Sequence, residues 1–160
     1  MPEIERPFTA FRFSVQIRVD GVASEVCEAS FSECDGLEMT MEPKTIREGG
    51  NNNRQIHLAG PVSYGQLTLK RGMTSNFDLW DWFEKVLQRG GNGFRADVQV
   101  KIMTSDGANV EASYLLTRCL PIKFKVPALT AQDGQIAIEE MQLAYERISL
   151  EDRRVPRVEE

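Results

Sequence analysis

Strict alternation of apolar and polar residues recurs along the chain, and it constrains the fold more than any other feature. In residues 11–19, "FRFSVQIRV", every second residue is apolar, from Phe11 to Val19. Successive side chains of a β-strand point to opposite faces, so this pattern predicts a strand with one buried face and one wet face. The same pattern predicts further strands in residues 37–42, 64–72, 96–103, 110–116 and 122–126. We therefore expect a mainly β domain with mostly antiparallel strands.

Two details of these strands carry predictions of their own. The turn "SDGA" contains the Asp-Gly pair typical of a hairpin, so residues 96–103 and 110–116 should pair. In the last strand Ile136 and Ile138 set one phase, whereas Met141, Leu143 and Tyr145 set the other. This change of phase predicts a β-bulge at the two adjacent glutamates, residues 139–140. Neighbours on a strand point to opposite faces, so those glutamates cannot share a site.

One segment has the period of a helix instead. In "KRGMTSNFDLWDWFEKV", residues 70–86, the apolar side chains fall on one broad arc, while Asp78 and Asp81 fall on the wet side. The glycine pair at residues 90–91 should end the helix. We interpret the aromatic cluster as the core-facing side of an amphipathic helix and not as a cofactor site. The predicted core face is Leu79, Trp80, Trp82, Phe83, Val86 and Leu87.

Composition excludes several classes of protein. At 160 residues the chain is long enough for one domain with a substantial core. A net charge of −5 disfavours a dedicated nucleic-acid binder, which needs clustered Lys and Arg. No stretch is long and apolar enough to span a membrane, and the first residues lack a signal-peptide pattern. Three cysteines without a CxxC pair favour reduced thiols over a disulfide framework or a zinc site.

The search for chemistry finds no catalytic constellation. His57 is the only histidine, which excludes a site with several histidine ligands. The segment "REGGNNNR" lacks the lysine and the Ser or Thr of a phosphate-binding loop. We therefore predict no catalytic residue, no metal and no cofactor. A hydrolase that uses Cys119 or His57 remains an alternative without a supporting motif.

Two features predict interactions with other chains. Residues 46–62, "IREGGNNNRQIHLAGPV", are polar and rich in glycine, and we expect a long loop there, of the kind that is usually functional or mobile. Several long strands in one small domain also leave open sheet edges, which attract other strands. Only Pro43, Pro121 and the expected bulge would blunt them. Pairing with identical neighbours in a closed ring would satisfy these edges.

Four segments, in this order, resemble the tail-tube protein family of contractile-tailed phages and extracellular contractile injection systems. They are "FRFSVQIRVDG", "SFSECDGLEMTMEPKTIREGGNNN", "LTLKRGMTSNFDLWDWFEKV" and "LPIKFKVPALTAQDGQIAIEEMQLAYE". The resemblance covers most of residues 8–148. It implies a single tail-tube domain over residues 1–148, containing the long loop 46–62, and a charged C-terminal tail over residues 149–160.

The resemblance also implies an architecture. The fold would be an antiparallel β-sandwich or barrel (mainly β, α+β) with one amphipathic helix. Six copies would form a ring whose hairpins complete one β-barrel around a lumen, and rings would stack into a hollow tube. The loop after the second strand would contact the neighbouring ring through Arg47, Glu48, Gly49, Gly50, Asn53 and Arg54.

Function and partners follow from the same resemblance. The protein would be a structural tube protein and not an enzyme, conducting cargo or DNA through its lumen when a sheath protein contracts. Its other partners would be baseplate and spike proteins, without stable membrane insertion. It would be made in the bacterial cytoplasm and assembled into a virion tail or an injection particle. Two alternatives stay open: a tube-initiating paralogue at the baseplate, and a monomeric β-rich binding or adaptor module that uses loop 46–62.

Overall fold

The computed structural model describes residues 12–20, 31–47, 49–50, 54–88, 94–129, 131, 134 and 136–153, with side chains up to residue 151. Within these residues the chain forms eleven strands and one helix, so the mainly β prediction is confirmed. Seven of the strands form one large antiparallel sheet, and four form two small two-stranded sheets. The helix is α1 (Asp78–Gln88), as the helical period of its sequence predicts.

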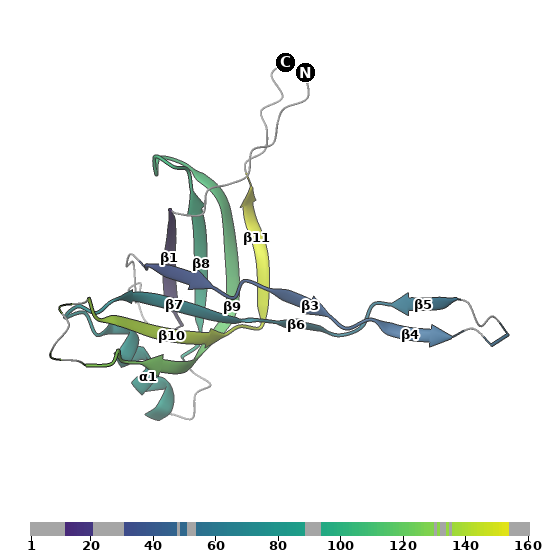
Figure 1. Ribbon diagram of the computed structural model, residues 1–160, viewed down its shortest axis with the longest axis horizontal. Coiled ribbons are helices and arrows are strands. Elements are labelled where there is room, and N and C mark those ends of the chain that lie inside the picture. The colour runs from purple at the N-terminus through teal and green to yellow at the C-terminus, as the bar shows by residue number, and fades with distance from the viewer. Residues whose placement is uncertain are drawn as a thin grey trace, which may run out of the picture.

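The large sheet folds over into two layers that cross at a steep angle (Figure 1). The first layer contains β1 (Phe13–Val19), β8 (Ala96–Met103), the first part of β9 (Val110–Lys125) and β11 (Arg147–Arg153). The second contains the last part of β9, β10 (Ile138–Ala144), β7 (Gln66–Gly72) and β2 (Glu33–Asp35). Beyond it, β3 (Met39–Met41) pairs with β6 (Val62–Tyr64), and β4 (Lys44–Arg47) pairs with β5 (Gln55–Leu58).

Strand β9 joins the two layers, because it belongs to both. We predicted two strands here, in residues 110–116 and 122–126, but the structure has one strand of 16 residues. Arg118 has a φ of 55°, a left-handed conformation that redirects the strand. As far as Cys119 β9 pairs with β8 and β11, and from Leu120 onwards it pairs with β10. Pro121 is tolerated inside the strand because this second half pairs on one side only within the described chain.

The core lies between the two layers and under the helix. Alternate side chains of each strand fill it, as the sequence pattern predicts. Its fully buried members include Val15, Ile17, Leu67, Leu69, Leu79, Val98, Leu116, Met141 and Leu143. From the helix, Trp82 is only 2% exposed, and its Nε1–H donates to the Phe94 carbonyl oxygen at 2.7 Å. Leu79, Trp82 and Val86 are buried and Phe83 packs against the core, so these four predictions are confirmed.

The same prediction was wrong for two residues of the helix. Trp80 is 47% exposed and Leu87 is 68% exposed. Both lie at the margins of the apolar arc, which is wider than the strip that the sheet covers. The expected end of the helix, at residues 90–91, lies outside the described residues.

Strands β10 and β11 correct two further predictions. No bulge occurs at residues 139–140, because β10 pairs with β7 in unbroken register from Ile138 to Ala144. Glu139, and not Ile138, points into the core, and the register shift lies against β9 between Gln142 and Leu143. The tail predicted over residues 149–160 is wrong for its first residues, since β11 pairs with β9 as far as Arg153, and the rest of that segment lies outside the described residues.

Candidate assembly surfaces

A two-stranded arm built from β3, β4, β5 and β6, residues 39–64, projects from the body of the molecule (Figure 1). The prediction of a loop over residues 46–62 was wrong, since both flanks of this segment are paired strands. Ile46 lies opposite Ile56, and Arg47 lies opposite Gln55. Glycine and asparagine dominate only the tip, whereas β-branched and polar residues on either side of it can form a ladder.

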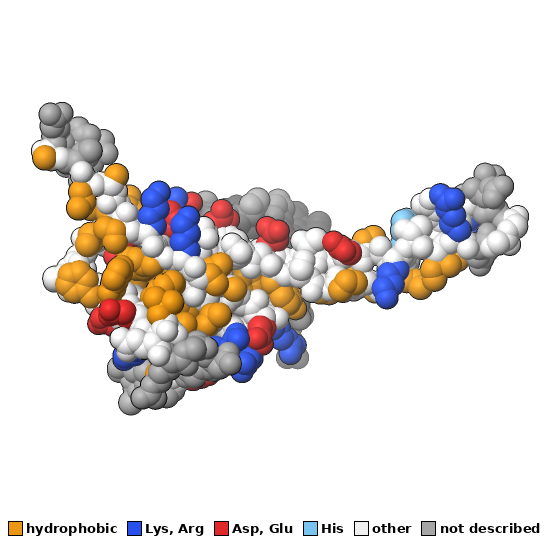
Figure 2. Space-filling view, turned by 90° about the horizontal axis from the view of Figure 1, so that it is seen from below, with side chains coloured by type: hydrophobic (Ala, Val, Ile, Leu, Met, Phe, Trp, Pro, Cys, Tyr) orange, Lys and Arg blue, Asp and Glu red, His pale blue; other side chains and the backbone are white. Residues whose placement is uncertain are grey.

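The arm carries apolar side chains that nothing in the described chain covers. Met39 is 68% exposed and Met41 is 50% exposed, and Met41 lies opposite the exposed Val62. Farther out, Ile46 and Leu58 are also exposed, and Figure 2 shows apolar side chains at intervals along the arm. An isolated two-stranded hairpin is marginally stable in water, so an arm of this kind needs a packing partner.

The tip of the arm holds the residues that the resemblance assigns to ring stacking. Arg47 and Arg54 lie on the two sides of the tip and are exposed, as are Gly49 and Gly50. Gly50 has a φ of 98°, which suits glycine and few other residues. Glu48 and Asn53, the other two predicted residues, lie outside the described residues.

The root of the arm is fixed to the body by Tyr145, which sequence reasoning did not single out. Its hydroxyl donates to the Gly36 carbonyl at 2.8 Å and accepts from the Glu38 amide at 3.1 Å. Its ring lies 5.7 Å from that of Tyr64 on the returning strand. Gly36 has a φ of 99°, and a side chain there would collide with the Gln66 carbonyl. This junction sets the direction in which the arm leaves the body.

The large sheet ends in edges that are open within the described residues. In the first layer β1 pairs only with β8, and β11 pairs only with β9. In the second layer β2 pairs only with β7. Each outer edge presents unpaired backbone donors and acceptors to any strand that approaches it.

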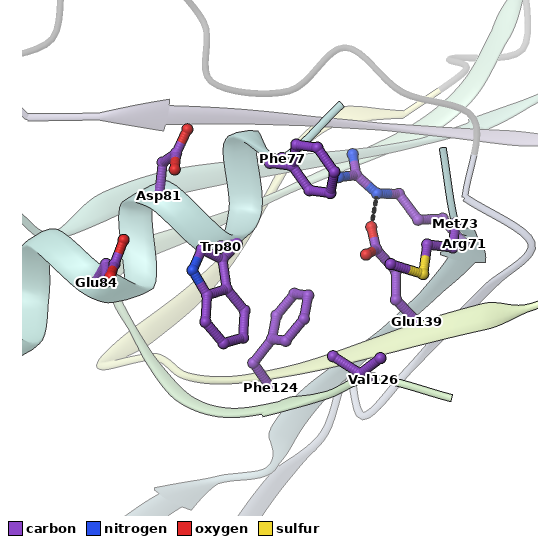
Figure 3. A pocket seen from close by; sticks show the side chains of 9 residues that line it. All are labelled: Arg71, Met73, Phe77, Trp80, Asp81, Glu84, Phe124, Val126 and Glu139. Atoms are coloured by element: carbon purple, nitrogen blue, oxygen red, sulfur yellow. Dashed lines mark hydrogen bonds and ion pairs between the residues drawn. The ribbon is translucent and has the colours of Figure 1, made fainter. Parts of the chain in front are cut away.

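A groove of about 460 Å³ lies beside the helix, and it is mainly aromatic and apolar. Trp80 and Phe77 from the helix segment face Phe124 and Val126 from the end of β9 (Figure 3). The Trp80 and Phe124 rings meet edge to face at 5.5 Å. Phe77, Trp80 and Val126 are all well exposed, so this groove is an apolar surface and not a closed core. Side chains of this size on a surface typically mark an interaction site.

A buried ion-pair network closes one end of the groove. Arg71 and Glu139 are direct partners across β7 and β10, and their side chains form a short salt bridge (Figure 3). Arg71 Nη2 also lies 2.7 Å from Asp78 Oδ1 at the start of the helix. Asp78 was predicted to be on the wet face, but this contact draws it inward, whereas Asp81 is exposed. The sequence did hold a signal, because Arg71 and Glu139 both occupy inward positions of alternating strands.

The residues that could carry chemistry are dispersed. His57 is exposed on β5. Burial raises the pKa of the Cys34 and Cys119 thiols to about 12, which makes both poor nucleophiles. Cys27 lies outside the described residues. In the part of the chain that the structure describes, no group of His, Cys, Asp and Glu residues is placed to hold a metal ion, and no helix is long and apolar enough to cross a membrane.

Comparison with known proteins identifies the family of this chain. The sequence model of the family described as "T4-like virus tail tube protein gp19" matches residues 9–149, which is most of the chain. The chain belongs to this tail-tube family. The resemblance drawn from the four sequence segments is thereby confirmed. No curated protein matches the chain significantly.

Solved structures show that the tail-tube fold extends over nearly the whole chain. A chain of the anti-feeding prophage baseplate, a six-fold symmetrised structure, is 26% identical with a TM-score of 0.83, and the match covers 95% of this chain and 100% of that one. A chain of the PVC sheath–tube complex in the extended state is 19% identical with a TM-score of 0.76, covering 92% and 93%. A chain of the PVC sheath/tube terminator is also 19% identical, with a TM-score of 0.78, covering 93% and 99%.

Proposed function

We propose that this tail-tube protein assembles into hexameric rings that stack into the hollow inner tube of a contractile injection system or phage tail. In this assembly, open strand edges of neighbouring copies pair around the ring and so complete a barrel around the lumen. A six-fold symmetrised baseplate contains the similar anti-feeding prophage chain, which supports a ring of six.

The arm is the observation that carries the proposal. It extends an uncovered apolar surface and a basic tip away from the only core in the described chain. A monomeric adaptor would have to keep this surface in water, at the cost of exposing Met39, Met41 and Val62. A neighbouring ring would cover it. We therefore assign ring stacking to the arm, with Arg47, Glu48, Gly49, Gly50, Asn53 and Arg54 at its tip.

The other partners follow from the same assembly. A sheath protein would surround the tube and drive it forward on contraction, and cargo or DNA would pass through the lumen. Baseplate and spike proteins would lie at one end. The protein itself would have no enzymatic role, which agrees with the raised pKa of the Cys34 and Cys119 thiols and with the dispersed polar residues of the described chain. It would be made in the bacterial cytoplasm and function in a virion tail or an injection particle.

A position at the baseplate end of the tube is the second candidate. The chain shares 26% identity with the baseplate chain of the anti-feeding prophage and 19% with chains of the two PVC structures. This difference favours a tube initiator, which joins the spike to the tube body. In particles purified with their baseplate, a tube initiator would be found only next to the spike, and a tube-body protein along the whole tube.

Removing the tip of the arm tests the proposal. Deleting residues 49–53 should leave thermal stability nearly unchanged, because Gly49 and Gly50, the described residues of this segment, are exposed. Rings of the shortened protein should no longer stack, and electron micrographs should contain single rings instead of tubes. Normal tubes from the shortened protein would show that the arm tip is not the stacking element. A protein that is monomeric in both forms would favour the adaptor alternative.

A further inference from the structure

The groove beside α1 is the strongest site in the described chain that the proposed function does not yet use. Phe77, Trp80, Phe124 and Val126 line it, and two carboxylates, Asp81 and Glu84, lie on its helix side (Figure 3). We propose that this groove is the acceptor site for the arm of a second copy of this chain. The inference rests on the proposed function, because it names the surface on which the stacking arm docks.

Apolar surfaces match first. The outer part of the arm places Ile46, Ile56 and Leu58 on one face, since residues directly opposite across a strand pair point the same way. Ile46 and Leu58 are exposed, and this face has the width of a single hairpin. The groove offers aromatic rings of similar exposure. Docking would remove the apolar side chains of both surfaces from water. It would stabilise the arm, which lacks a core of its own, and bury the half-exposed Trp80.

Charges match as well. Residues 44–58 contain three basic residues and one acidic residue, whereas the helix, residues 78–88, contains three acidic residues and one basic residue. Asp78 already forms an ion pair with Arg71, but Asp81 and Glu84 form no ion pair within the described residues. Lys44 on the arm is likewise exposed, and it lies on the same face as Ile46 because it is the direct partner of Leu58. Opposite charges around an apolar centre steer association and fix the register of the partners.

The ion-pair network gives the acceptor site a rigid base. Arg71 connects Glu139 of β10 to Asp78 at the first turn of the helix, and it also donates to the Asn76 carbonyl at 3.1 Å. These contacts hold the start of α1, and with it Phe77 and Trp80, against the sheet. A groove that keeps its shape before binding loses less free energy on docking than one that must be ordered first.

Site-specific photo-cross-linking tests the docking site directly. The full-length protein carries p-benzoylphenylalanine in place of Trp80, and ¹⁵N-labelled and unlabelled copies are mixed before assembly. After irradiation, mass spectrometry should find this residue joined to the tryptic peptide of residues 55–70, with the two isotopes mixed because the contact lies between copies. A matched variant carries the photoreactive residue at Lys85, which is exposed on the same helix and does not line the groove. It should not cross-link to the arm.

Charge reversal provides an independent test. Asp81→Lys should prevent tube formation, and adding Lys44→Glu should restore it. The matched control adds Lys101→Glu on β8, an inner strand of the first sheet layer, which makes the same change in net charge and should restore nothing.

The outcomes separate this inference from the proposed function. Tubes that form normally but cross-link from position 80 to another part of the chain, or to a sheath protein, overturn the docking site and leave the tube function intact. If the charge reversal on the arm does not restore tube formation in the variant with the charge reversal in the groove, the docking site is likewise overturned and the tube function stays intact. A wild-type protein that never assembles overturns both.

Discussion

Replacing the two tryptophans of α1 by alanine, one at a time, should lower the free energy of unfolding by very different amounts. Trp82 is 2% exposed and donates its indole N–H to the Phe94 carbonyl, so Trp82→Ala removes a buried ring and leaves a cavity. The expected loss in free energy of unfolding is about 3–5 kcal/mol, and the lost hydrogen bond adds about 1 kcal/mol. Trp80 is 47% exposed and touches Phe124 at its edge. Trp80→Ala should cost only about 1–2 kcal/mol, because roughly half of its area is already in water.

Urea denaturation of both variants and the wild type, at one low protein concentration, measures this difference. In thermal melts Trp82→Ala should lower Tm by roughly 10–20 °C, since each kcal/mol shifts a domain of this size by about 2–4 °C. Trp80→Ala should fold well but stack poorly, because its ring belongs to the proposed acceptor groove. Equal losses of stability in the two variants would refute the assignment of Trp82 to the core and Trp80 to the surface.

Three further predictions concern the ion-pair network, the arm root and the thiols. Arg71→Met should cost about 3–5 kcal/mol in urea denaturation by leaving the carboxylates of Glu139 and Asp78 unpaired, and adding Glu139→Leu should recover part of it, because Glu139 is the more buried of the two; a double variant as unstable as the single one would contradict this account. Tyr145→Phe should cost about 1–3 kcal/mol and speed hydrogen exchange at the arm root, where its hydroxyl makes two hydrogen bonds; unchanged exchange would show that the arm is fixed by other contacts. The pKa of Cys34 and Cys119 rises to about 12 in the folded protein from an ordinary value of 9.0, so these thiols keep their protons while those of the unfolded chain ionise. The free energy of unfolding should therefore fall as the pH rises from 9 to about 12, and replacing both cysteines with alanine should flatten that fall.

Local patterns in the sequence predicted the elements of the fold well, because burial on one face has a fixed period. The alternation in residues 11–19 predicted the buried positions of β1, and the helical period predicted α1 with its three buried side chains. The same reasoning divided β9 in two, because the apolar alternation breaks at Arg118, shortly before Pro121. Only the three-dimensional arrangement reveals that this half of β9 lies at an edge, where a missing N–H is tolerated.

The candidate surfaces were less predictable, because they depend on what lies opposite each residue. Trp80 and Trp82 are equally apolar, and no local pattern says where the covering sheet ends. The segment from residue 46 to residue 62 contains a glycine-rich tip, and this composition concealed the pairing of Ile46 with Ile56 on its flanks. Arg71 and Glu139 were detectable in principle, as opposite charges at inward positions of two strands that pair.

The mass of the purified particle tests the central claim most directly. Each chain has a mass of 18.1 kDa, so a ring of six would have a mass of about 109 kDa. Light scattering coupled to size exclusion, at increasing protein concentration, should give this mass or multiples of it as rings stack. After deletion of residues 49–53, only the mass of a single ring should be observed at every concentration. A constant mass of 18.1 kDa at every concentration would contradict the account of this protein as a ring-forming tube subunit.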